Sequence, residues 1–201
     1  MANVSRLRGF TPVKYKNGAP YTGACRKYFI ASGDGTAVYV GDPVKLAGSA
    51  DTDGTSPTVI MAAANDSLVG VVVGFAYNPD NLNVSGQYRV ASTNRYVYVA
   101  DSPDLVFEIE ASNGTPAATD VGLNASFAVG TPSATTGRSG AYVDFGTEAT
   151  TSTLELKILG FAPRIDNEVG ASAKLLVSIN KHQLATGGQD DGGTADGVVG
   201  V

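Results

Sequence analysis

Apolar residues alternate with polar ones at a period of two in several short runs of this chain. Few of them repeat at the three-to-four spacing of an amphipathic helix. In one run, Leu105, Phe107 and Ile109 fall on one side. Glu108 and Glu110 fall on the other side. This alternation predicts a half-buried β-strand from Leu105 to Glu110.

A similar alternation recurs from Leu154 to Ile158, where we expect Leu154, Leu156 and Ile158 to face inward and Glu155 and Lys157 to face outward. Other short runs are rich in the β-branched and aromatic residues that favour strands. They lie at residues 27–31, 36–40, 58–62, 68–77, 88–92, 95–100, 141–145 and 174–179. Clusters of Gly, Asp, Asn and Pro separate them. The spacing predicts an all-β fold, either a β-sandwich or a β-barrel.

The connections carry their own signals. Asp101-Ser102-Pro103-Asp104 fills a four-residue gap between two predicted strands with turn-forming residues, which predicts a hairpin. Gly33-Asp34-Gly35 lacks the third glycine of a dinucleotide fingerprint, so we interpret it as a hairpin turn. Residues 111–140 are rich in Ser and Thr and predict long surface loops.

The two ends differ from the middle of the chain. Residues 1–23 contain Pro12, Pro20 and three glycines with little alternation, which predicts an extended N-terminal arm. In residues 187–201, five glycines and three aspartates come before Val198, and Val199 and Val201 follow it. We therefore expect one β-rich domain over residues 24–186, flanked by an arm and a Gly/Asp-rich tail. Removing either end should leave that domain stable.

Charge is distributed unevenly along the 201 residues. The net charge is −5 and the isoelectric point is near 4.7, which argues against a broad basic face for nucleic acid. Of the 14 Lys and Arg residues, six precede Asp34, whereas all 19 acidic residues lie from Asp34 onward. No apolar run is long enough to span a bilayer. We expect a basic leading segment on an acidic body, with no direct nucleic-acid or membrane partner.

A single cysteine, Cys25, allows neither an internal disulfide nor a thiolate metal cluster. We expect it to be a buried, inert thiol. Arg6 and Arg8 are not followed by the apolar core and small-residue cleavage site of a secretory signal. We therefore expect the chain to be made and assembled in the cytoplasm of a host cell.

Residues that could carry chemistry are isolated. His182 has no second histidine and no cysteine with which to bind a metal, so a structural role is favoured. Ser139 lies in Gly137-Arg138-Ser139-Gly140, which lacks the spacing of a nucleophile elbow and is interpreted as a glycine-rich loop. We expect no catalytic residue and no cofactor.

Two acidic patterns could also be interpreted as sites for chemistry. Asp51-Thr52-Asp53-Gly54 has oxygen ligands at alternate positions but lacks the downstream Glu of a calcium loop, so a polar turn is favoured. Glu108 and Glu110 have the spacing of paired glycosidase carboxylates. A solvated strand face has the same pattern, and we favour that interpretation because nothing else converges on the pair.

Several longer stretches carry a resemblance. They are Gly9–Lys14 with Asn17–Tyr21, Val40–Leu46, Val97–Ile109, Asp166–Gly170 and Ala173–His182. As a set, these stretches resemble a family of small virion proteins of tailed bacteriophages, which are known as head-associated structural proteins. The resemblance runs from about Gly9 to His182, and it carries over no catalytic residue.

The resemblance implies a decoration or cement protein on the outside of a phage capsid, where it clamps neighbouring subunits of the major capsid protein. We expect a homo-oligomer, either a dimer or a trimer. In this interpretation both termini are assembly arms. The opposite charges of the two ends would let an arm of one copy meet a tail of another, or let Arg6 and Arg8 reach acidic residues of the shell. Phe10 and the tail residues Val198, Val199 and Val201 would fill apolar grooves of a partner.

Two alternatives stay open at this point. A tail or adaptor component of the virion would share the same composition, and only its position in a particle would separate it from a head protein. A carbohydrate-binding β-sandwich would need aromatic platforms, which the nine Tyr residues could provide in the absence of Trp.

Overall fold

A computed structural model describes residues 3–77 and 86–185 of the chain. Within these ranges the structure is all-β, and one short 3-10 turn, η1 (Ala118–Asp120), interrupts the strands. This confirms the predicted fold class. The strands are β1 (Thr11–Tyr15), β2 (Arg26–Ile30), β3 (Val38–Tyr39), β4 (Pro43–Ala50), β5 (Pro57–Met61), β6 (Gly70–Phe75), β7 (Tyr88–Arg89), β8 (Arg95–Ala100), β9 (Leu105–Ser112), β10 (Asn124–Val129), β11 (Ala141–Ala149), β12 (Leu156–Phe161) and β13 (Lys174–Ile179).

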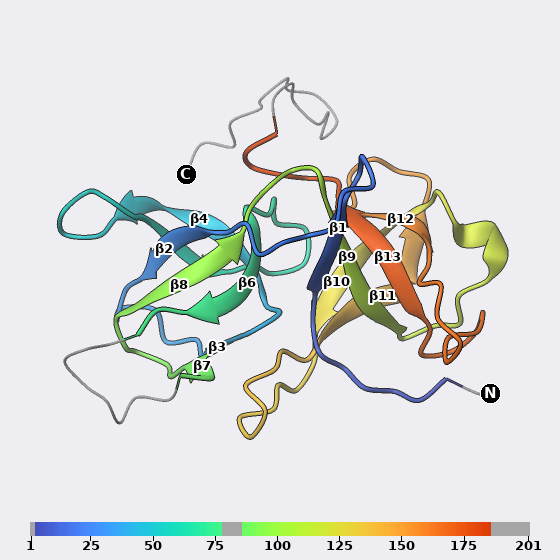
Figure 1. Cartoon of the computed structure of the whole chain (residues 1–201), viewed down its shortest axis with the longest axis horizontal. Helices are drawn as coiled ribbons and strands as arrows, with labels where there is room; N and C mark the ends of the chain where they lie inside the picture. Colours follow the sequence, from blue (N-terminus) through green and yellow to red (C-terminus); the bar gives the residue numbers. More distant parts are fainter. Residues whose placement is uncertain (1–2, 78–85, 186–201) are drawn as a thin grey trace.

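The first half of the chain closes into a barrel with the strand order β2-β5-β4-β6-β8, hereafter barrel one (Figure 1). Antiparallel pairing of β2 with β8 closes it on one side, and a single parallel pair, Phe29 with Thr58, closes it between β2 and β5. Valines alternate inward along these strands and form its core with Tyr28 and Ile30. The short pair β3 and β7 lies beside this barrel.

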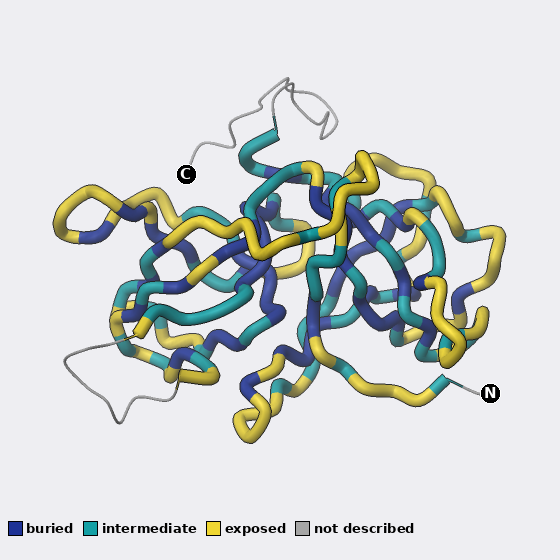
Figure 2. The backbone as a smooth tube through the Cα atoms, viewed as in Figure 1, coloured by how far each residue is buried: buried dark blue, intermediate teal, exposed yellow. Residues whose placement is uncertain are grey.

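The second half forms another closed ring, barrel two, in which β9, β11, β10, β12 and β13 pair in turn and β13 returns to β9. Phenylalanine side chains lie at the centre of its core, where Phe10 meets Phe107 and Phe127 edge to face, at 5.9 and 6.2 Å between ring centroids. The region expected as one β-rich domain therefore holds two barrels, each with its own core. Figure 2 shows buried backbone running through both.

Residues 101–104 do not form the predicted hairpin. β8 pairs with β2 and β6, whereas β9 pairs with β1, β11 and β13, so these residues carry the chain from one barrel to the other. The Asp101 carboxylate accepts a hydrogen bond from the Tyr28 hydroxyl at 2.8 Å and pairs with Arg26 at 3.3 Å. Turn-forming residues change the direction of the chain both in a hairpin and in a crossover. The two are distinguished only by the strands with which the flanking strands pair.

The N-terminal segment is part of the folded body and is not the predicted free arm. β1 pairs with β9 in the register Thr11 with Glu108 and Tyr15 with Leu105. Pro12 is tolerated because β1 has a bulge between Pro12 and Lys14 and proline is compatible with irregular and edge positions. Phe10 is only 2% exposed. The expectation that residues 1–23 bury too little apolar surface to fold on this chain is therefore wrong.

Three strands were not predicted: β1, β4 and β10. β4 begins at Pro43 and contains Gly48, while β10 lies inside residues 111–140, where Ser and Thr abundance predicted loops. The predicted strand at 154–158 begins later, at Leu156, and Glu155 is buried where its Oε2 accepts a hydrogen bond from Ser126 Oγ at 2.7 Å. The predicted turn at Gly33–Gly35 is also no hairpin, because β2 and β3 pair with different strands.

The two barrels meet where residues 9–10 cross residues 39–42. Phe10 N–H donates to the Gly41 carbonyl at 3.0 Å, and Val40 is bonded through its own backbone to Gly137 and Ser139 of barrel two. A Cβ placed on Gly9 would lie 2.4 Å from the Gly41 carbonyl oxygen. Both glycines have a positive φ, +69° and +98°. Glycine at these two positions therefore lets the two backbones touch.

Asp42 lies buried at this junction, where its Oδ2 accepts a hydrogen bond from Tyr39 N–H at 2.7 Å. Burial raises the pKa of Asp42 to about 6, and hydrogen bonds from Ser139 and from the Tyr39 backbone oppose this only in part.

The part of the chain that the structure describes contains no apolar helix of the length that a membrane span needs.

The first prediction concerns Asp42→Asn. Because the folded-state pKa of Asp42 exceeds its unfolded value, ionising it opposes folding: this cost is absent below about pH 4 and grows as the pH rises through about 6. Asn should therefore raise the free energy of unfolding at pH 8 by up to about 3 kcal/mol and by almost nothing at pH 4. Urea denaturation of both proteins from pH 4 to pH 8 measures the difference. A stability difference that does not change with pH would contradict the assignment.

The second prediction concerns Phe10→Ala. Loss of a buried aromatic side chain leaves a cavity in barrel two, so the free energy of unfolding should fall by about 3 to 5 kcal/mol. Val4→Ala, at an exposed position of the same segment, is the matched control and should change stability by less than about 0.5 kcal/mol. Equal effects of the two substitutions in chemical denaturation would show that the segment is not packed as described.

Candidate interaction surface

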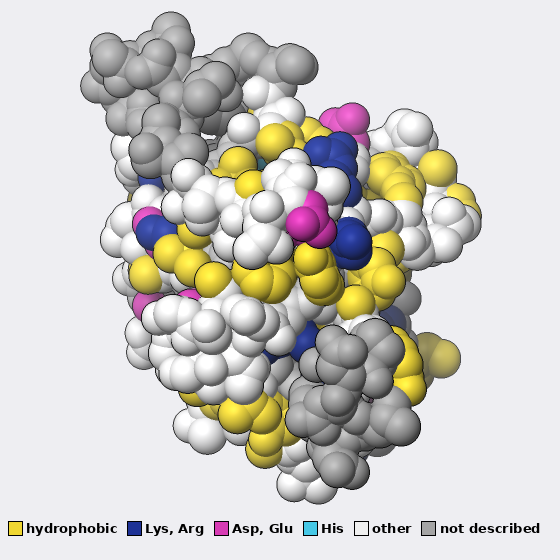
Figure 3. All heavy atoms as spheres, turned by 90° about the vertical axis from the view of Figure 1, so that its left-hand side faces the viewer, with side chains coloured by type: hydrophobic (Ala, Val, Ile, Leu, Met, Phe, Trp, Pro, Cys, Tyr) yellow, Lys and Arg dark blue, Asp and Glu magenta, His cyan; other side chains and the backbone are white. Residues whose placement is uncertain are grey.

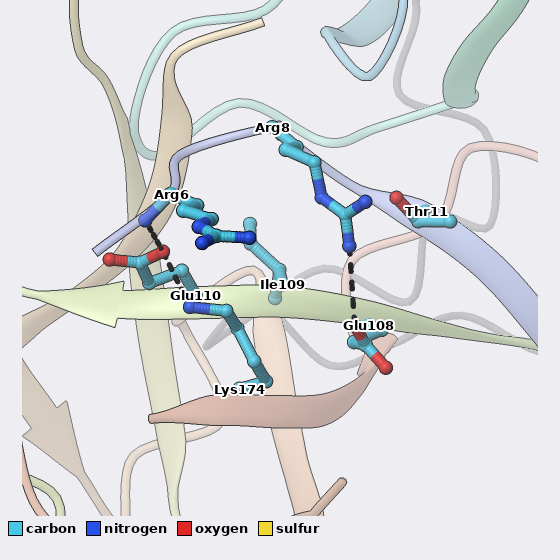
Figure 4. A pocket seen from close by; sticks show the side chains of 8 residues that line it. Arg6, Arg8, Thr11, Glu108, Ile109, Glu110 and Lys174 are labelled. Atoms are coloured by element: carbon cyan, nitrogen blue, oxygen red, sulfur yellow. Dashed lines mark hydrogen bonds and ion pairs between the residues drawn. The ribbon is translucent and has the colours of Figure 1, made fainter. Parts of the chain in front are cut away.

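Residues 3–9 run across the outside of barrel two, over β9 and β13 (Figure 4). Gly9 and Phe10 fix one end of this segment through the contact with Gly41. Asn3 fixes the other end: its side-chain amide donates to the carbonyls of Glu168 and Ala171 at 2.8 and 2.9 Å. The segment is therefore held at both ends against the folded body.

The loop that receives Asn3 connects β12 to β13 and is itself fixed from within. Asn167 Nδ2 donates to the carbonyls of Ala162 and Lys174 at 2.9 and 2.8 Å, and its Oδ1 accepts a hydrogen bond from Lys174 N–H at 2.7 Å. Glu168 N–H donates to Asn3 Oδ1 at 2.8 Å, which completes the connection. One asparagine side chain thus closes the loop, and another attaches the N-terminal segment to it.

A buried ion pair lies under the segment. Lys174 Nζ is 2.7 Å from Glu110 Oε2, the same oxygen that accepts a hydrogen bond from Arg6 N–H at 2.7 Å. Lys174 Nζ also donates to the carbonyl of Val4 at 3.3 Å. Figure 4 shows Glu110 between Lys174 and the Arg6 backbone. Glu110 Oε2 thus has both partners of this carboxylate, whereas its Oε1 is buried without a hydrogen-bond partner among the described residues. The charge of the buried carboxylate is balanced by Lys174, as buried charges require.

Glu108 forms a second and more exposed pair. Its Oε1 is 2.7 Å from Arg164 Nη1 and 3.8 Å from Arg8 Nη2. Arg164 also contacts Asp166 at 3.2 Å, and its guanidinium lowers the pKa of that carboxyl by hydrogen bonding and charge. The acidic side chains here are therefore already paired within the chain.

Some basic side chains on and beside residues 3–9 are not neutralised by carboxylates of the described residues. The Arg6 side chain is exposed, and no ion pair joins its guanidinium to any residue in the described ranges. The side chain of Arg8 is 53% exposed, and in the described ranges its ion pair is the 3.8 Å contact with Glu108. Lys14, on the neighbouring strand, is also exposed.

Large apolar side chains are exposed in the same region. Ile165 is 96% exposed, Val4 is 62% exposed and Val169 is 55% exposed. Val4 follows the asparagine that is bonded to residues 168 and 171, so these side chains belong to one area of the surface. We call Val4, Arg6, Arg8, Ile165 and Val169 the N-terminal surface. Apolar groups flanked by cations are suited to binding an apolar surface with acidic residues around it.

The cavity beneath the segment, lined by Arg6, Arg8, Glu108, Glu110 and Lys174, has a volume of about 10 Å³. That is room for about one water molecule and not for a sugar ring. Glu110 is buried and ion-paired, so the interpretation of this pair as a solvated strand face is wrong. Strand alternation placed the carboxylates opposite the apolar core correctly, but it could not predict that another segment covers them.

Of the residues proposed to contact a partner, the structure brings Arg6 and Arg8 together on the N-terminal surface. Phe10 is not available to a partner, because its ring lies in the core of its own chain and cannot fill a groove of another protein. Val198, Val199 and Val201 lie outside the described residues.

Sequence reasoning missed most of the groups that fix this surface: Asn3, Arg164, Asn167 and Lys174. No motif marks them individually. Two stretches that contributed to the resemblance do contain some of them: Asn167 and Val169 lie in Asp166–Gly170, and Lys174 lies in Ala173–His182. Ile165 is an apolar residue among charged ones. The sequence does not show that its side chain is exposed, and only the folded structure does.

His182 and Ser139, the isolated candidates for chemistry, are each buried and hydrogen-bonded within the fold. His182 is buried; its Nδ1 accepts a hydrogen bond from Leu184 N–H at 3.0 Å, and burial lowers its pKa to about 4. Ser139 is buried in the junction, where its Oγ accepts a hydrogen bond from Ala141 N–H at 2.9 Å. Cys25 is exposed, so the expectation of a buried thiol is wrong.

Residues 51–54 form the predicted polar turn. The Asp51 carboxylate accepts hydrogen bonds from Thr55 N–H at 2.8 Å, Ser56 N–H at 3.1 Å and the Tyr96 hydroxyl at 3.0 Å. Burial acts to raise its pKa, but these hydrogen bonds outweigh that effect and lower the pKa to about 2. In the described residues no group of three or more His, Cys, Asp or Glu side chains is placed to hold a metal ion.

Comparison of the chain with protein-family models, with curated proteins and with solved structures found no match.

The third prediction tests how the surface is supported. Lys174→Ala leaves the buried Glu110 carboxylate without its cation, so the free energy of unfolding should fall by about 3 to 5 kcal/mol. Arg164→Ala is the matched control, because it removes exposed ion pairs and should cost less than about 1 kcal/mol. Urea denaturation compares the two. Equal losses would show that Lys174 and Glu110 are not a buried pair in solution.

Proposed function

We propose that this protein is a structural component of a tailed-bacteriophage head that binds the outside of the capsid and stabilises contacts between major capsid protein subunits. Two observations support the proposal: the resemblance of residues 9–182 to phage head proteins, and the N-terminal surface. The second carries it further, because it supplies a specific place of contact.

The N-terminal surface has the properties of a protein-binding site. It presents Ile165, Val4 and Val169 to solvent on a segment and a loop that are already fixed by hydrogen bonds, so little conformational entropy is lost when they bind. Such exposed apolar side chains supply affinity when a partner buries them. Arg6 and Arg8 then favour a partner with acidic residues and set its orientation.

A weak contact of this kind is sufficient on a capsid. A symmetric shell presents the same surface many times, so many modest contacts add up, and a ligand that binds only the assembled shell stabilises it by mass action. A homo-oligomer, either a dimer or a trimer, would engage several shell subunits at once. In this proposal the protein acts by binding, in the virion, after assembly in the host cytoplasm, and it needs no cofactor.

The fourth prediction tests this surface. Purified protein is added to phage shells that lack it, and occupancy is measured by cosedimentation for wild type, Ile165→Asp and Val169→Asp. Each variant should occupy the shell at least about tenfold more weakly, because a charge replaces an apolar anchor. Val121→Asp, at an exposed valine outside this surface, is the matched control and should bind like wild type. Arg6→Glu should weaken binding most at low salt.

Electron microscopy of decorated particles provides the independent readout. Density for the protein on the outer face of the capsid lattice, with residues 3–9 and 164–171 against the shell, is the expected result. Density at the tail or at the head-to-tail connector would overturn the head assignment in favour of a tail or adaptor component. Equal occupancy by all variants would remove the N-terminal surface from the binding site.

A further inference from the structure

Barrel one has a groove that the proposed function does not use. Its volume is about 420 Å³, and it runs between residues 31–36 on one side and strands β4 and β5 on the other. Small and apolar side chains of the two strands line it, among them Ala47, Ser49 and Ile60. Figure 3 looks onto barrel one and shows a face on which most side chains are uncharged. Sites for small ligands usually have volumes of roughly 300 to 1,000 Å³, so the groove has the size of such a site.

Two aromatic side chains border one end of the groove. Phe29 of β2 pairs with Thr58, which lines the groove, and its neighbours in the chain lie in the core of barrel one, so its own ring points outward. Ala31, two residues further along, lines the groove as well. Tyr96 of β8 is opposite Phe29 in the sheet, and the centroids of the two rings are 5.1 Å apart. The aromatic pair and the groove therefore form one continuous surface.

The aromatic pair is fixed within the protein. The Tyr96 hydroxyl donates a hydrogen bond to the Asp51 carboxylate at 3.0 Å, and the Lys27 ammonium lies 4.5 Å from the centroid of the same ring. Phe29 and Tyr96 are both partly exposed. Rings that are already held in place lose little conformational entropy when a ligand packs against them. The pair is therefore a preformed platform at the end of the groove.

Polar side chains lie on both sides of the groove. On one side Ser49 is exposed, and its hydroxyl is hydrogen-bonded to that of Thr58. On the other side Asp34 Oδ1 accepts a hydrogen bond from Thr36 N–H at 2.9 Å. Asp34 is the one charged side chain among the lining residues, and it is 3.6 Å from the guanidinium of the buried Arg89, which balances its charge. The groove therefore presents hydroxyl groups without an uncompensated charge.

A backbone donor also faces the groove. Ala62 N–H donates to the Pro43 carbonyl of β4, so by alternation Met61 N–H points away from β4, toward β2. If β2 continued in register, the Ala31 carbonyl would accept this hydrogen bond. That carbonyl instead accepts a hydrogen bond from Arg89 Nη2 at 2.8 Å. Met61 N–H is therefore placed to donate to a ligand in the groove.

These features favour a sugar over other classes of ligand. A sugar ring has weakly positive C–H groups, which pack against the negative face of an aromatic ring, and hydroxyls that both donate and accept hydrogen bonds. A nucleic acid needs clustered cations, and no Lys or Arg is among the described residues that line the groove. An added peptide strand needs a run of free backbone groups, whereas β5 pairs with β2 at Thr58 and ends at Met61. The balanced charge of the lining favours a neutral sugar.

We propose that barrel one binds a neutral oligosaccharide, with one sugar ring against Phe29 and Tyr96 and the next ring in the groove beside Ile60. The hydroxyls of the second ring bond to the Ser49 hydroxyl and to Met61 N–H. The aromatic and apolar side chains supply the area that the sugar buries, and the few polar groups set its orientation. This inference concerns a different surface from the N-terminal surface and does not rest on the proposed function.

The fifth prediction tests this site by NMR titration of the full-length protein with maltopentaose, cellopentaose, mannopentaose and galactopentaose, each up to about 10 mM, which detects millimolar dissociation constants. At least one of these sugars should shift the amide resonance of Met61. Phe29→Ala removes an aromatic contact and Ala47→Glu fills the groove, so each should weaken binding of that sugar at least about tenfold. Tyr142→Ala, in barrel two, and Ala50→Glu, on the exposed end of β4 outside the lining, are the matched controls and should bind like wild type.

Three results would overturn the proposal. One is the absence of a Met61 shift with all four sugars, whether or not an uncharged peptide produces one. Another is unchanged affinity in Ala47→Glu, which tests the groove even if Phe29→Ala does not fold, because Ala47 is exposed. The third is a loss of affinity in Ala50→Glu as large as that in Ala47→Glu. None of these results depends on capsid binding, so failure here is distinguishable from failure of the proposed function.

Discussion

The backbone contact between Gly9 and Gly41 is the constraint on which the arrangement of this protein depends. Phe10 N–H donates to the Gly41 carbonyl, and neither position has space for a Cβ. This contact holds the N-terminal segment, which lies on barrel two, against residues 39–42 and directs Phe10 into the core of barrel two. Residues 3–8 are thereby led along β9, where the charged groups of barrel two receive them.

The same region contains the least favourable group of the junction. No cation of the described residues pairs with the Asp42 carboxylate, and burial raises its pKa. Its side chain holds the turn at Tyr39 through a backbone hydrogen bond, so it has a positional role that a purely apolar residue could not fill. Polar groups of this kind favour one specific packing arrangement at some cost in stability.

The two barrels present surfaces of different chemistry to solvent. The N-terminal surface of barrel two combines cations with exposed apolar side chains and is suited to a partner with acidic groups. A groove of barrel one, lined by residues 31–36 and by strands β4 and β5, has Asp34 as the one charged side chain among its lining residues. The two surfaces share no residues, so a ligand bound to one does not compete for side chains with a ligand bound to the other.

The sequence by itself determined the all-β class, the positions of most strands and the basic character of the N-terminal segment, because alternation, turn residues and charge are local properties of the chain. Alternation from Leu105 to Ile109 was sufficient to place those side chains in a core. The tertiary structure alone decided which strands pair, so the hairpin at 101–104 became a crossover and one expected domain became two barrels. It also decided the fate of Phe10, which could have filled a partner's groove but fills its own core, and of Glu110, which a second segment covers. The contacts of Phe10 and Glu110 join residues about one hundred positions apart in the sequence. A local pattern of residues does not identify partners at that distance.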